Sequence, residues 1–137
     1  TKEHCSKKFK PISIEKIDGG TNIDQDYLVS SSDDRTIKIW NMRTGKCLRT
    51  LHEHTSLINS LRINNENEFV SGSDDSKIII WNIRTGECLR TLKGHTNSVL
   101  SLIINNENEL ISGSYDNTIK IWNMRTGQCL RTLHEHT

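Results

Sequence analysis

One unit recurs in this chain every 41 residues, and this period limits the possible folds more than any other feature. Each copy carries the tripeptide Ile-Trp-Asn, with its tryptophan at Trp40, Trp81 and Trp122, followed by the segment Cys-Leu-Arg-Thr-Leu. A period of about 20–50 residues indicates an array of one supersecondary unit, which buries its apolar faces by stacking on copies of itself. Chemically suggestive residues that recur at the same place in each unit are therefore expected to be structural.

The repeated unit consists of four short apolar or β-branched runs separated by turn-prone residues. In the third copy these runs are 99–104, 110–114, 118–122 and 129–133. In the second copy they are 58–63, 69–73, 78–81 and 88–92. The first copy offers 27–32, 36–40 and 47–51, and its first strand is expected at 12–14. Runs of this length with hairpin-length turns predict antiparallel four-stranded meanders, and no helical periodicity competes with them.

Two of the predicted strands are apolar at consecutive positions. These stretches are residues 78–80 and 102–104. A strand with one face in water would alternate apolar and polar residues, so we expect both faces of these sheets to be covered. Stacked blades of a ring provide such cover.

Composition argues against several classes of partner. The net charge is +1, which gives no strong field for nucleic acid or an anionic membrane surface. No apolar run is long enough to cross a bilayer. Residues 1–10 are polar and basic, lack the hydrophobic core of a signal peptide, and are expected to form a poorly ordered tail.

The cysteines follow the repeat and are expected to be structural. Cys47, Cys88 and Cys129 occupy equivalent positions, where neighbouring copies need not approach within disulfide distance, and they lack the close spacing of a zinc site. We expect them to be reduced and half-buried, which favours an intracellular, cytoplasmic location. Cys5 lies outside the repeat and has no assigned role.

Taken together, these motifs resemble the WD-repeat family of β-propellers over about residues 27–137. The third copy carries the family's Gly-His pair, serine-rich second strand and aspartate turn as Gly94-His95, Ser112-Gly113-Ser114 and Asp116-x-Thr118-Ile119-Lys120-Ile121-Trp122. The resemblance implies an all-β fold of propeller blades, each a four-stranded antiparallel meander, with three blades in an incomplete ring. The expected boundaries are 11–51, 52–92 and 93–133, with the start of a fourth blade at 134–137.

The resemblance also implies a hydrogen-bonded set of His, Ser, turn Asp and Trp in each unit. The implied sets are His54, Ser71, Asp75 and Trp81 in the second copy, and His95, Ser112, Asp116 and Trp122 in the third. The first copy offers Asp34 and Trp40 but lacks the histidine, because the repeat spacing leads to Ser13, or to Lys7 with the insertion removed. Two departures from the family pattern are Trp-Asn in place of Trp-Asp and Glu53 in place of Gly.

Motifs that suggest chemistry fall on these same structural positions. The His-x-His pairs at 52–54 and 134–136 have the spacing of metal ligands, but one histidine of each takes the structural position and no third ligand is evident. Asp33-Asp34 and Asp74-Asp75 are adjacent carboxylates, yet the third copy has Tyr115 at the first of these positions. P-loop, dinucleotide-binding and Gly-x-Ser-x-Gly fingerprints are absent. We expect no catalytic residue, metal or cofactor.

The function that the resemblance implies is a non-catalytic scaffold for protein–protein interaction. Its narrow face would bind partner proteins through the residue before each turn aspartate and the residues after each Gly-His position. Those residues are Asp33, Asp74, Tyr115, Leu57, Asn59, Ser98 and Leu100. They vary between copies whose framework agrees, as a recognition surface would, although neutral drift of exposed loops would also produce such variation.

Several alternatives stay open at this point. One is an enzyme with a polar or metal site in the central channel, and another is an adaptor module of a larger ubiquitin-ligase or signalling protein. Propeller rings have about 4–8 blades, so three copies leave apolar end faces uncovered. The ring would be completed either by the remainder of a longer propeller or by self-association, with two chains giving six blades.

Overall fold

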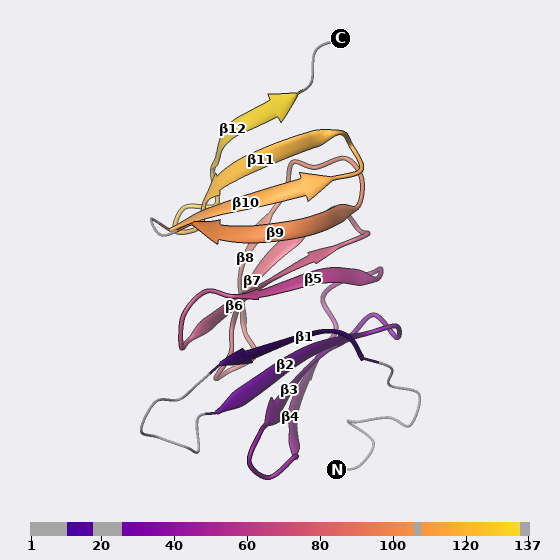
Figure 1. The fold of residues 1–137 in the computed structure, drawn as a ribbon, viewed down its shortest axis with the longest axis vertical. Helices are drawn as coiled ribbons and strands as arrows, with labels where there is room; N and C mark the ends of the chain where they lie inside the picture. The colour runs from indigo at the N-terminus through magenta and orange to yellow at the C-terminus, as the bar shows by residue number, and fades with distance from the viewer. Residues whose placement is uncertain (1–10, 18–25, 106–107, 135–137) are drawn as a thin grey trace.

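The residues that the structure describes fold into three sheets stacked one on the next (Figure 1). A computed structural model describes residues 11–17, 26–105 and 108–134. These residues form twelve strands and no helix, so they contain no helix long and apolar enough to cross a membrane. The prediction of an all-β fold with three four-stranded antiparallel meanders is confirmed, and the ring is not closed by the described residues.

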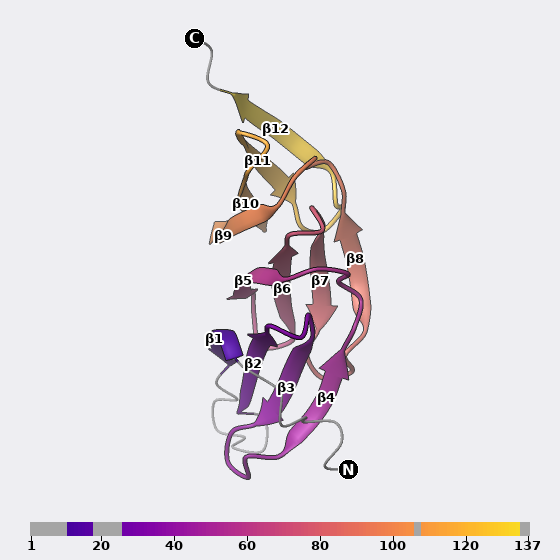
Figure 2. The same cartoon turned by 90° about the vertical axis from the view of Figure 1, so that its right-hand side faces the viewer.

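Each sheet is a meander whose strands pair in chain order. Sheet I consists of β1 (Pro11–Ile17), β2 (Tyr27–Ser32), β3 (Ile37–Asn41) and β4 (Cys47–Leu51). Sheet II consists of β5 (Ile58–Ile63), β6 (Glu68–Ser73), β7 (Ile78–Asn82) and β8 (Cys88–Leu92). Sheet III consists of β9 (Val99–Asn105), β10 (Glu109–Ser114), β11 (Thr118–Asn123) and β12 (Cys129–His134). Seen from the side, the first strands follow one edge of the stack and the fourth strands follow the other (Figure 2).

The strand register is the same in all three sheets. A register shift precedes Trp40, Trp81 and Trp122 where the third strand pairs with the fourth. A β-bulge of this kind re-aims the side chain beside it. The repeated sequence therefore places each indole at the same point of its sheet.

The asparagine of each Ile-Trp-Asn closes the following turn. Asn41 Oδ1 accepts hydrogen bonds from the backbone N–H groups of Arg43 and Thr44 at 2.9 and 3.1 Å. Asn82 and Asn123 do the same in the other sheets. Only the side-chain oxygen is used, so Asn performs here the acceptor role that an Asp could also perform.

The apolar cores lie between sheets rather than inside one sheet. The first core joins Val29, Ile37 and Ile39 of sheet I to Ile58, Leu61, Phe69, Ile79, Trp81 and Ile83 of sheet II. The second joins Val70, Ile78, Ile80 and Leu92 of sheet II to Val99, Leu102, Leu110, Trp122 and Met124 of sheet III. Sheet II is therefore covered on both faces, as its consecutive isoleucines at 78–80 predict.

Two expectations from the sequence are wrong. Residues 102–104 are not covered on both faces, since Ile103 is 58% exposed and no further sheet among the described residues lies beyond sheet III. The cysteines are not all reduced either, because Cys88 and Cys129 are free but Cys47 is disulfide-bonded. The argument from reduced cysteines to an intracellular location therefore loses one of its three thiols.

Some predictions fall outside the described residues. These are the predicted tail at 1–10, Cys5, Lys7 and most of the predicted start of a fourth blade, including His136. Ser13 is described only by its place on β1, opposite Ser31 of β2.

Candidate functional site

Sheets II and III each hold a chain of four hydrogen-bonded side chains. In sheet II, Trp81 Nε1 donates to Ser71 Oγ at 2.8 Å, Ser71 Oγ lies 2.6 Å from His54 Nε2, and His54 Nδ1 lies 2.9 Å from Asp75 Oδ2. In sheet III the corresponding distances are 2.8, 2.7 and 2.7 Å, and the residues are Trp122, Ser112, His95 and Asp116. The structure thus brings together the four side chains that the sequence associates in each of these copies.

The direction of these hydrogen bonds follows from the chemistry of their ends. The indole N–H of Trp81 can only donate, so Ser71 Oγ accepts it. The Ser71 hydroxyl is then available to donate to His54 Nε2, which leaves the imidazole proton on Nδ1, facing the Asp75 carboxylate. Each member is satisfied, in keeping with the absence of unpartnered buried side-chain nitrogen or oxygen atoms among the described residues.

Burial and hydrogen bonding set the charges in the sheet II network. Burial lowers the pKa of His54 below its ordinary value of 6.5, although the hydrogen bond to Asp75 and its negative charge act to raise it. Burial acts to raise the pKa of Asp75, but hydrogen bonds from His54 and the Lys77 N–H outweigh it and lower this pKa below 3.8. The pair is therefore a neutral imidazole against an ionised carboxylate near neutral pH.

The turn aspartates also tie two loops together. Asp75 accepts from the backbone N–H of Thr55 at 3.0 Å and from that of Lys77 at 2.9 Å. Asp116 accepts from the N–H groups of Thr96 and Thr118 at 3.1 and 2.9 Å. Burial acts to raise the pKa of Asp116, but hydrogen bonds from Thr118, His95 and Thr96 lower it strongly. Each carboxylate fixes the loop before the first strand against the hairpin between the second and third strands.

Sheet I has a reduced version of this arrangement. Trp40 Nε1 donates to Ser30 Oγ at 2.9 Å. Asp34 Oδ1 accepts from the Thr36 N–H at 3.0 Å and from the Thr36 hydroxyl at 2.5 Å. No described histidine connects Asp34 to Trp40 in one network. Sequence reasoning did not name Ser30, although the 41-residue spacing from Ser71 leads directly to it.

A serine hydrolase also has a hydrogen-bonded chain of Ser, His and Asp side chains. The serine in these networks, however, has different surroundings from a catalytic serine. Ser71 is 0% exposed, and its Oγ is already bonded to Trp81 and His54. A nucleophile must reach a substrate carbonyl with oxyanion-hole donors beside it. The buried hydroxyl of Ser71 offers no such access, so this geometry supports a structural role.

Within the described part of the chain, the paired histidines and carboxylates do not converge on a metal site. No group of three His, Cys, Asp or Glu side chains among the described residues could hold a metal ion. His52 is exposed, whereas His54 is buried in its network. A protein site for Zn²⁺ needs at least three convergent ligands, and the His-x-His pair supplies one free imidazole here.

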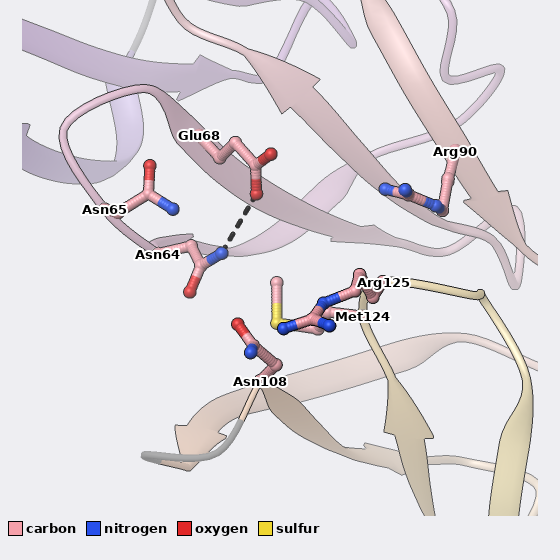
Figure 3. A pocket seen from close by; sticks show the side chains of 7 residues that line it. All are labelled: Asn64, Asn65, Glu68, Arg90, Asn108, Met124 and Arg125. Atoms are coloured by element: carbon pink, nitrogen blue, oxygen red, sulfur yellow. Dashed lines mark hydrogen bonds between the residues drawn. The ribbon is translucent and has the colours of Figure 1, made fainter.

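A small polar cavity lies between sheets II and III, with a volume of about 190 Å³. Its lining residues are Asn64, Asn65, Glu68, Arg90, Asn108, Met124 and Arg125 (Figure 3). Asn64 Nδ2 donates to Glu68 Oε1 at 3.0 Å, which occupies the one carboxylate of the cavity. The lining therefore lacks the pair of positioned acid and base groups that hydrolytic chemistry uses.

The residues predicted to bind partners gather where hairpins meet loops. The Asp74 N–H donates to the Leu57 carbonyl at 2.8 Å, and the Tyr115 N–H donates to the Ser98 carbonyl at 3.0 Å. The β2–β3, β6–β7 and β10–β11 hairpins lie on the same side of the stack, at the right in Figure 1. Asp33 precedes the equivalent turn of sheet I and is exposed.

Exposure divides the predicted surface into two groups. Tyr115 is 65% exposed, Leu100 is 41% exposed and Leu57 is 36% exposed. Asn59 is turned inward instead, because its Nδ2 donates to Asp74 Oδ1 at 2.7 Å and to the Val99 carbonyl at 2.9 Å. Asn59 thus links sheet II to sheet III, while the three apolar side chains face solvent.

Three segments of the chain match the family model described as WD domain, G-beta repeat. They are residues 14–41, 45–82 and 86–123. The second and third segments each begin before the fourth strand of one sheet and end with the third strand of the next. The unit of sequence is therefore offset by one strand from the unit of structure.

Curated relatives match over short parts of their length. The WD repeat-containing protein pop1 of Schizosaccharomyces pombe is 42% identical over 43 residues, which are 31% of this chain and 6% of that protein. The Lissencephaly-1 homolog of Heterostelium pallidum is 43% identical over 47 residues, 34% of this chain and 11% of that protein. The ribosome biogenesis protein BOP1 homolog of Drosophila melanogaster is 62% identical over 26 residues, 19% of this chain and 3% of that protein.

Solved structures share the arrangement over most of this chain. The WD40 β-propeller domain of Doa1 superposes with a TM-score of 0.79 at 24% identity, covering 90% of this chain and 40% of that one. The computationally designed protein Ika8 superposes with a TM-score of 0.74 at 38% identity, covering 80% of this chain and 34% of that one. The sheets are thus arranged like propeller blades, and the chain spans well under half the length of both structures.

Proposed function

Because this chain belongs to the WD40-repeat family, whose propellers generally bind other proteins, we propose that it is a non-catalytic scaffold that presents a recognition surface. The observation that carries this proposal is that three apolar side chains near hydrogen-bonded turns of sheets II and III are exposed: Tyr115, Leu100 and Leu57. Surfaces of this kind, apolar groups surrounded by polar ones, are typical of protein-binding sites.

A rigid frame supports these side chains. Asp116, next to Tyr115, accepts hydrogen bonds from Thr96, Thr118 and His95. The Tyr115 N–H is itself bonded to the Ser98 carbonyl. A surface that is ordered before binding loses less conformational entropy when a partner docks, which favours affinity.

The chemistry of the surface favours a particular partner. Tyr115 and Leu100 would contact an apolar side chain, since aromatic residues dominate the energetics of interfaces. Asp33 and Asp74 supply carboxylate acceptors on the same side, which suit backbone or basic donors. With a net charge of +1 the chain has no basic field for nucleic acid or an anionic membrane, so the proposed partner is a protein segment.

The repeat framework agrees between copies while this surface changes. The position before the turn aspartate is Asp33, Asp74 and Tyr115 in the three copies. A full ring would add further positions of this kind, whether other blades of a longer propeller or a second copy completes it. The adaptor role in a ubiquitin-ligase or signalling protein would use the same surface to hold one partner near another.

Peptide selection tests the proposed surface. A displayed library of random peptides is selected on the immobilised chain, and the affinity of the selected peptide is measured by titration calorimetry for Tyr115→Ala and Leu100→Ala. Each substitution is expected to weaken binding at least about tenfold, which corresponds to about 1.4 kcal/mol. The control Leu48→Ala changes an equally exposed leucine on β4, away from this surface, and should leave the affinity unchanged.

Two results would contradict the proposal. One is a peptide whose affinity is insensitive to both surface substitutions, and the other is equal loss with Leu48→Ala. Hydrolytic or other turnover that a chelator abolishes would favour the alternative of an enzyme with a metal site in the channel.

A further inference from the structure

Two arginine side chains border the polar cavity between sheets II and III. Arg90 extends from β8 of sheet II, and Arg125 lies in the turn between β11 and β12 of sheet III (Figure 3). Neither side chain makes a hydrogen bond or an ion pair with the described residues. A guanidinium group stays charged and carries five N–H donors. Two strong donor groups therefore line one cavity of about 190 Å³ without an acceptor from the described part of the chain.

The equivalent arginines between sheets I and II are bonded. Arg49 Nη2 donates to the Arg84 carbonyl at 3.0 Å, and Arg84 Nε donates to Asn67 Oδ1 at 2.7 Å. Arg90 and Arg125 occupy the same positions of the repeat 41 residues later, and their side chains form neither bond. The repeat thus uses both guanidinium groups at one junction and leaves both available at the next.

The backbone and stem of these arginines are held in place. A β-carbon on Gly127 would lie 3.8 Å from Arg90 Cδ, so the stem of Arg90 lies close to the β11–β12 turn. Arg125 is part of that turn, and its N–H donates to Asn123 Oδ1 at 2.9 Å. A site whose donors are carried by an ordered frame loses less conformational entropy when a ligand binds.

The charges and the amide groups of the lining favour an anion. Two guanidinium groups and one carboxylate, that of Glu68, leave one positive charge in excess. Glu68 Oε1 already accepts from Asn64 Nδ2 at 3.0 Å. Asn65 Oδ1 accepts from the Asn67 N–H at 2.8 Å, which leaves the Nδ2 group of Asn65 to donate. A ligand with one negative charge would neutralise the lining, whereas a dianion would reverse its sign.

The size of the cavity and its one apolar side chain restrict the ligand further. The share of liquid volume of one water molecule is about 30 Å³, so the cavity accommodates a group of several heavy atoms. Met124 is 3% exposed and supplies apolar surface among the polar lining residues. A thioether side chain adapts its shape and packs well against methylene groups. These features suit a carboxylate on a short methylene stem.

We propose that the cavity between sheets II and III binds a carboxylate group carried on a short methylene stem, with Arg90 and Arg125 as its main donors. Arginine pairs with carboxylates through two parallel N–H···O bonds, which give both strength and a fixed geometry. A glutamate side chain of a protein segment and a small free carboxylic acid both offer this chemistry.

This site is separate from the proposed recognition surface. Tyr115 lies in the β10–β11 hairpin, whereas the cavity is lined from the β5–β6, β9–β10 and β11–β12 connections, at the opposite ends of the strands (Figure 1). Loss of carboxylate binding would therefore leave the recognition surface untested, and failure of peptide selection would leave the cavity untested.

Methyl NMR of the two methionines tests the site in the 137-residue chain. Met124 lines the cavity, whereas Met42 directly follows β3 of sheet I and reports on events elsewhere. The probe is N-acetylglutamate methylamide, which presents a glutamate side chain as a protein does. It should shift the Met124 signal to saturation and leave the Met42 signal unchanged. The glutamine form of the probe has the same shape without the charge and should not bind.

Substitution of the arginines locates the binding. Arg90→Gln and Arg125→Gln should each weaken binding of the glutamate probe at least about tenfold, because each removes a charged group with two parallel donors. Arg131→Gln and Arg43→Gln are the matched controls. They remove the same charge at equivalent positions of the repeat outside the cavity, and should leave the affinity unchanged.

Glu68→Gln should change the affinity in the opposite direction. It keeps an oxygen that accepts from Asn64 but removes the competing negative charge, so the probe should bind several-fold more tightly. A gain in affinity does not result from a loss of folding. The control Glu53→Gln removes the same charge from an exposed position before β5 and should have no effect.

Propionate as a second probe distinguishes the two sources of the carboxylate. Tighter binding of the glutamate probe than of propionate assigns the site to a protein segment, and the reverse order assigns it to a free carboxylic acid. Either order supports the site, provided that the arginine substitutions weaken the binding.

Four results would overturn the proposal. They are a Met124 signal that neither carboxylate shifts to saturation, equal binding of the glutamine probe, equal loss of affinity with the control arginines, and inorganic phosphate that binds more tightly than both carboxylates. The dispersion of the amide spectrum checks that each variant is folded. Arg90→Lys and Arg125→Lys, which keep the charge but lack the planar pair of donors, provide a second set if a glutamine variant is not.

Discussion

Sheets I and II have the same strand register but different polar interiors. In sheet II, Ser71 joins Trp81 to His54, and His54 joins it to Asp75. In sheet I, Ser30 receives the indole of Trp40, but Asp34 is bonded to Thr36 instead. Both sheets nevertheless form four antiparallel strands. The comparison indicates that strand pairing and apolar stacking specify a blade, whereas the histidine network adds stability to a blade that is already specified.

The two sheets also differ in how far they are enclosed. Trp81 is 2% exposed and stacks on Phe69 with ring centroids 6.0 Å apart, while Trp40 is only half-buried. Sheet II is covered by a sheet on each side, and sheet I is covered on the face that is turned toward sheet II. The cost of a substitution should therefore depend on which copy of the repeat carries it.

The largest difference is expected between the tryptophans. Trp81→Ala should lower the free energy of unfolding by about 3–5 kcal/mol, because it leaves a cavity between sheets and removes the donor to Ser71. Trp40→Ala should cost less than half as much, since its side chain is less enclosed. Urea unfolding followed by circular dichroism at one fixed protein concentration measures both. Equal losses would show that enclosure does not separate the two sheets.

Removal of the histidine from sheet II is expected to have the next largest effect. His54→Ala leaves Asp75 Oδ2 and the Ser71 hydroxyl each without one partner, which should cost about 1–3 kcal/mol. His52→Ala is the matched control, because His52 is exposed two residues earlier and its loss should stay within about 0.5 kcal/mol. Sheet II without its histidine should then resemble sheet I, still folded but less stable. If His54→Ala were no worse than His52→Ala, the network would add nothing to the framework.

The family resemblance implied which residue types form the network, and the repeat spacing then carried that set from one copy to the next for a physical reason. Residues 41 positions apart occupy equivalent places because the sheets share one register, so the motif of one copy transfers to the next. The strands follow the same logic: β2, β4, β5 and β8 have the predicted bounds, and β7 extends one residue beyond its prediction, to Asn82. Strand β1 is longer than the predicted 12–14, because its pairing with β2 continues to Ile17 opposite Tyr27.

Other features depend on contacts that no local pattern encodes. The position of Asn59, shortly after the histidine of its repeat, predicts a surface residue. Its amide nevertheless donates hydrogen bonds to Asp74 and to the Val99 carbonyl, which is 40 residues along the chain. The consecutive apolar residues of β9 predict burial on both faces, yet Ile103 is exposed. It lies on the face of sheet III that is turned away from sheet II, and only a further sheet could cover that face. Spacing predicts position in the blade, and only the neighbouring blade decides which side chains are covered.

Acidification offers a smaller and reversible way to weaken sheet II relative to sheet I. The pKa of His54 is lowered below 6.5 by burial, and that of Asp75 is lowered below 3.8 by hydrogen bonds that outweigh burial. In both cases the unfolded chain takes up a proton at a higher pH than the folded chain. The stability is therefore complete above about pH 6.5, falls as His54 charges only on unfolding below that pH, and falls again below about pH 3.8.

Unfolding free energies at about pH 7.5 and about pH 5 measure the histidine part of this effect. The wild-type chain should lose stability over this interval, and His54→Gln, which keeps a polar side chain but cannot titrate, should lose less. The difference should be smaller than the cost of His54→Ala, because acidification removes only the proton-linked part. A pH dependence that His54→Gln leaves unchanged would place the titrating group elsewhere.

The smallest difference concerns a turn that all three sheets share. The residue after each turn aspartate adopts a left-handed conformation, with φ of 72° for Arg35, 69° for Ser76 and 70° for Asn117. Asn tolerates this conformation better than other non-glycine residues, so sheet III already has the favourable choice and sheet I does not. Arg35→Asn should raise the free energy of unfolding by a few tenths of a kcal/mol to about 1 kcal/mol, while Asn117→Arg should lower it by a similar amount. Because the two changes exchange residues between equivalent turns, opposite and similar shifts would show that the turns are interchangeable modules. Unequal shifts would instead mean that the cost of backbone strain depends, as we expect for the tryptophans, on the sheet that carries the turn.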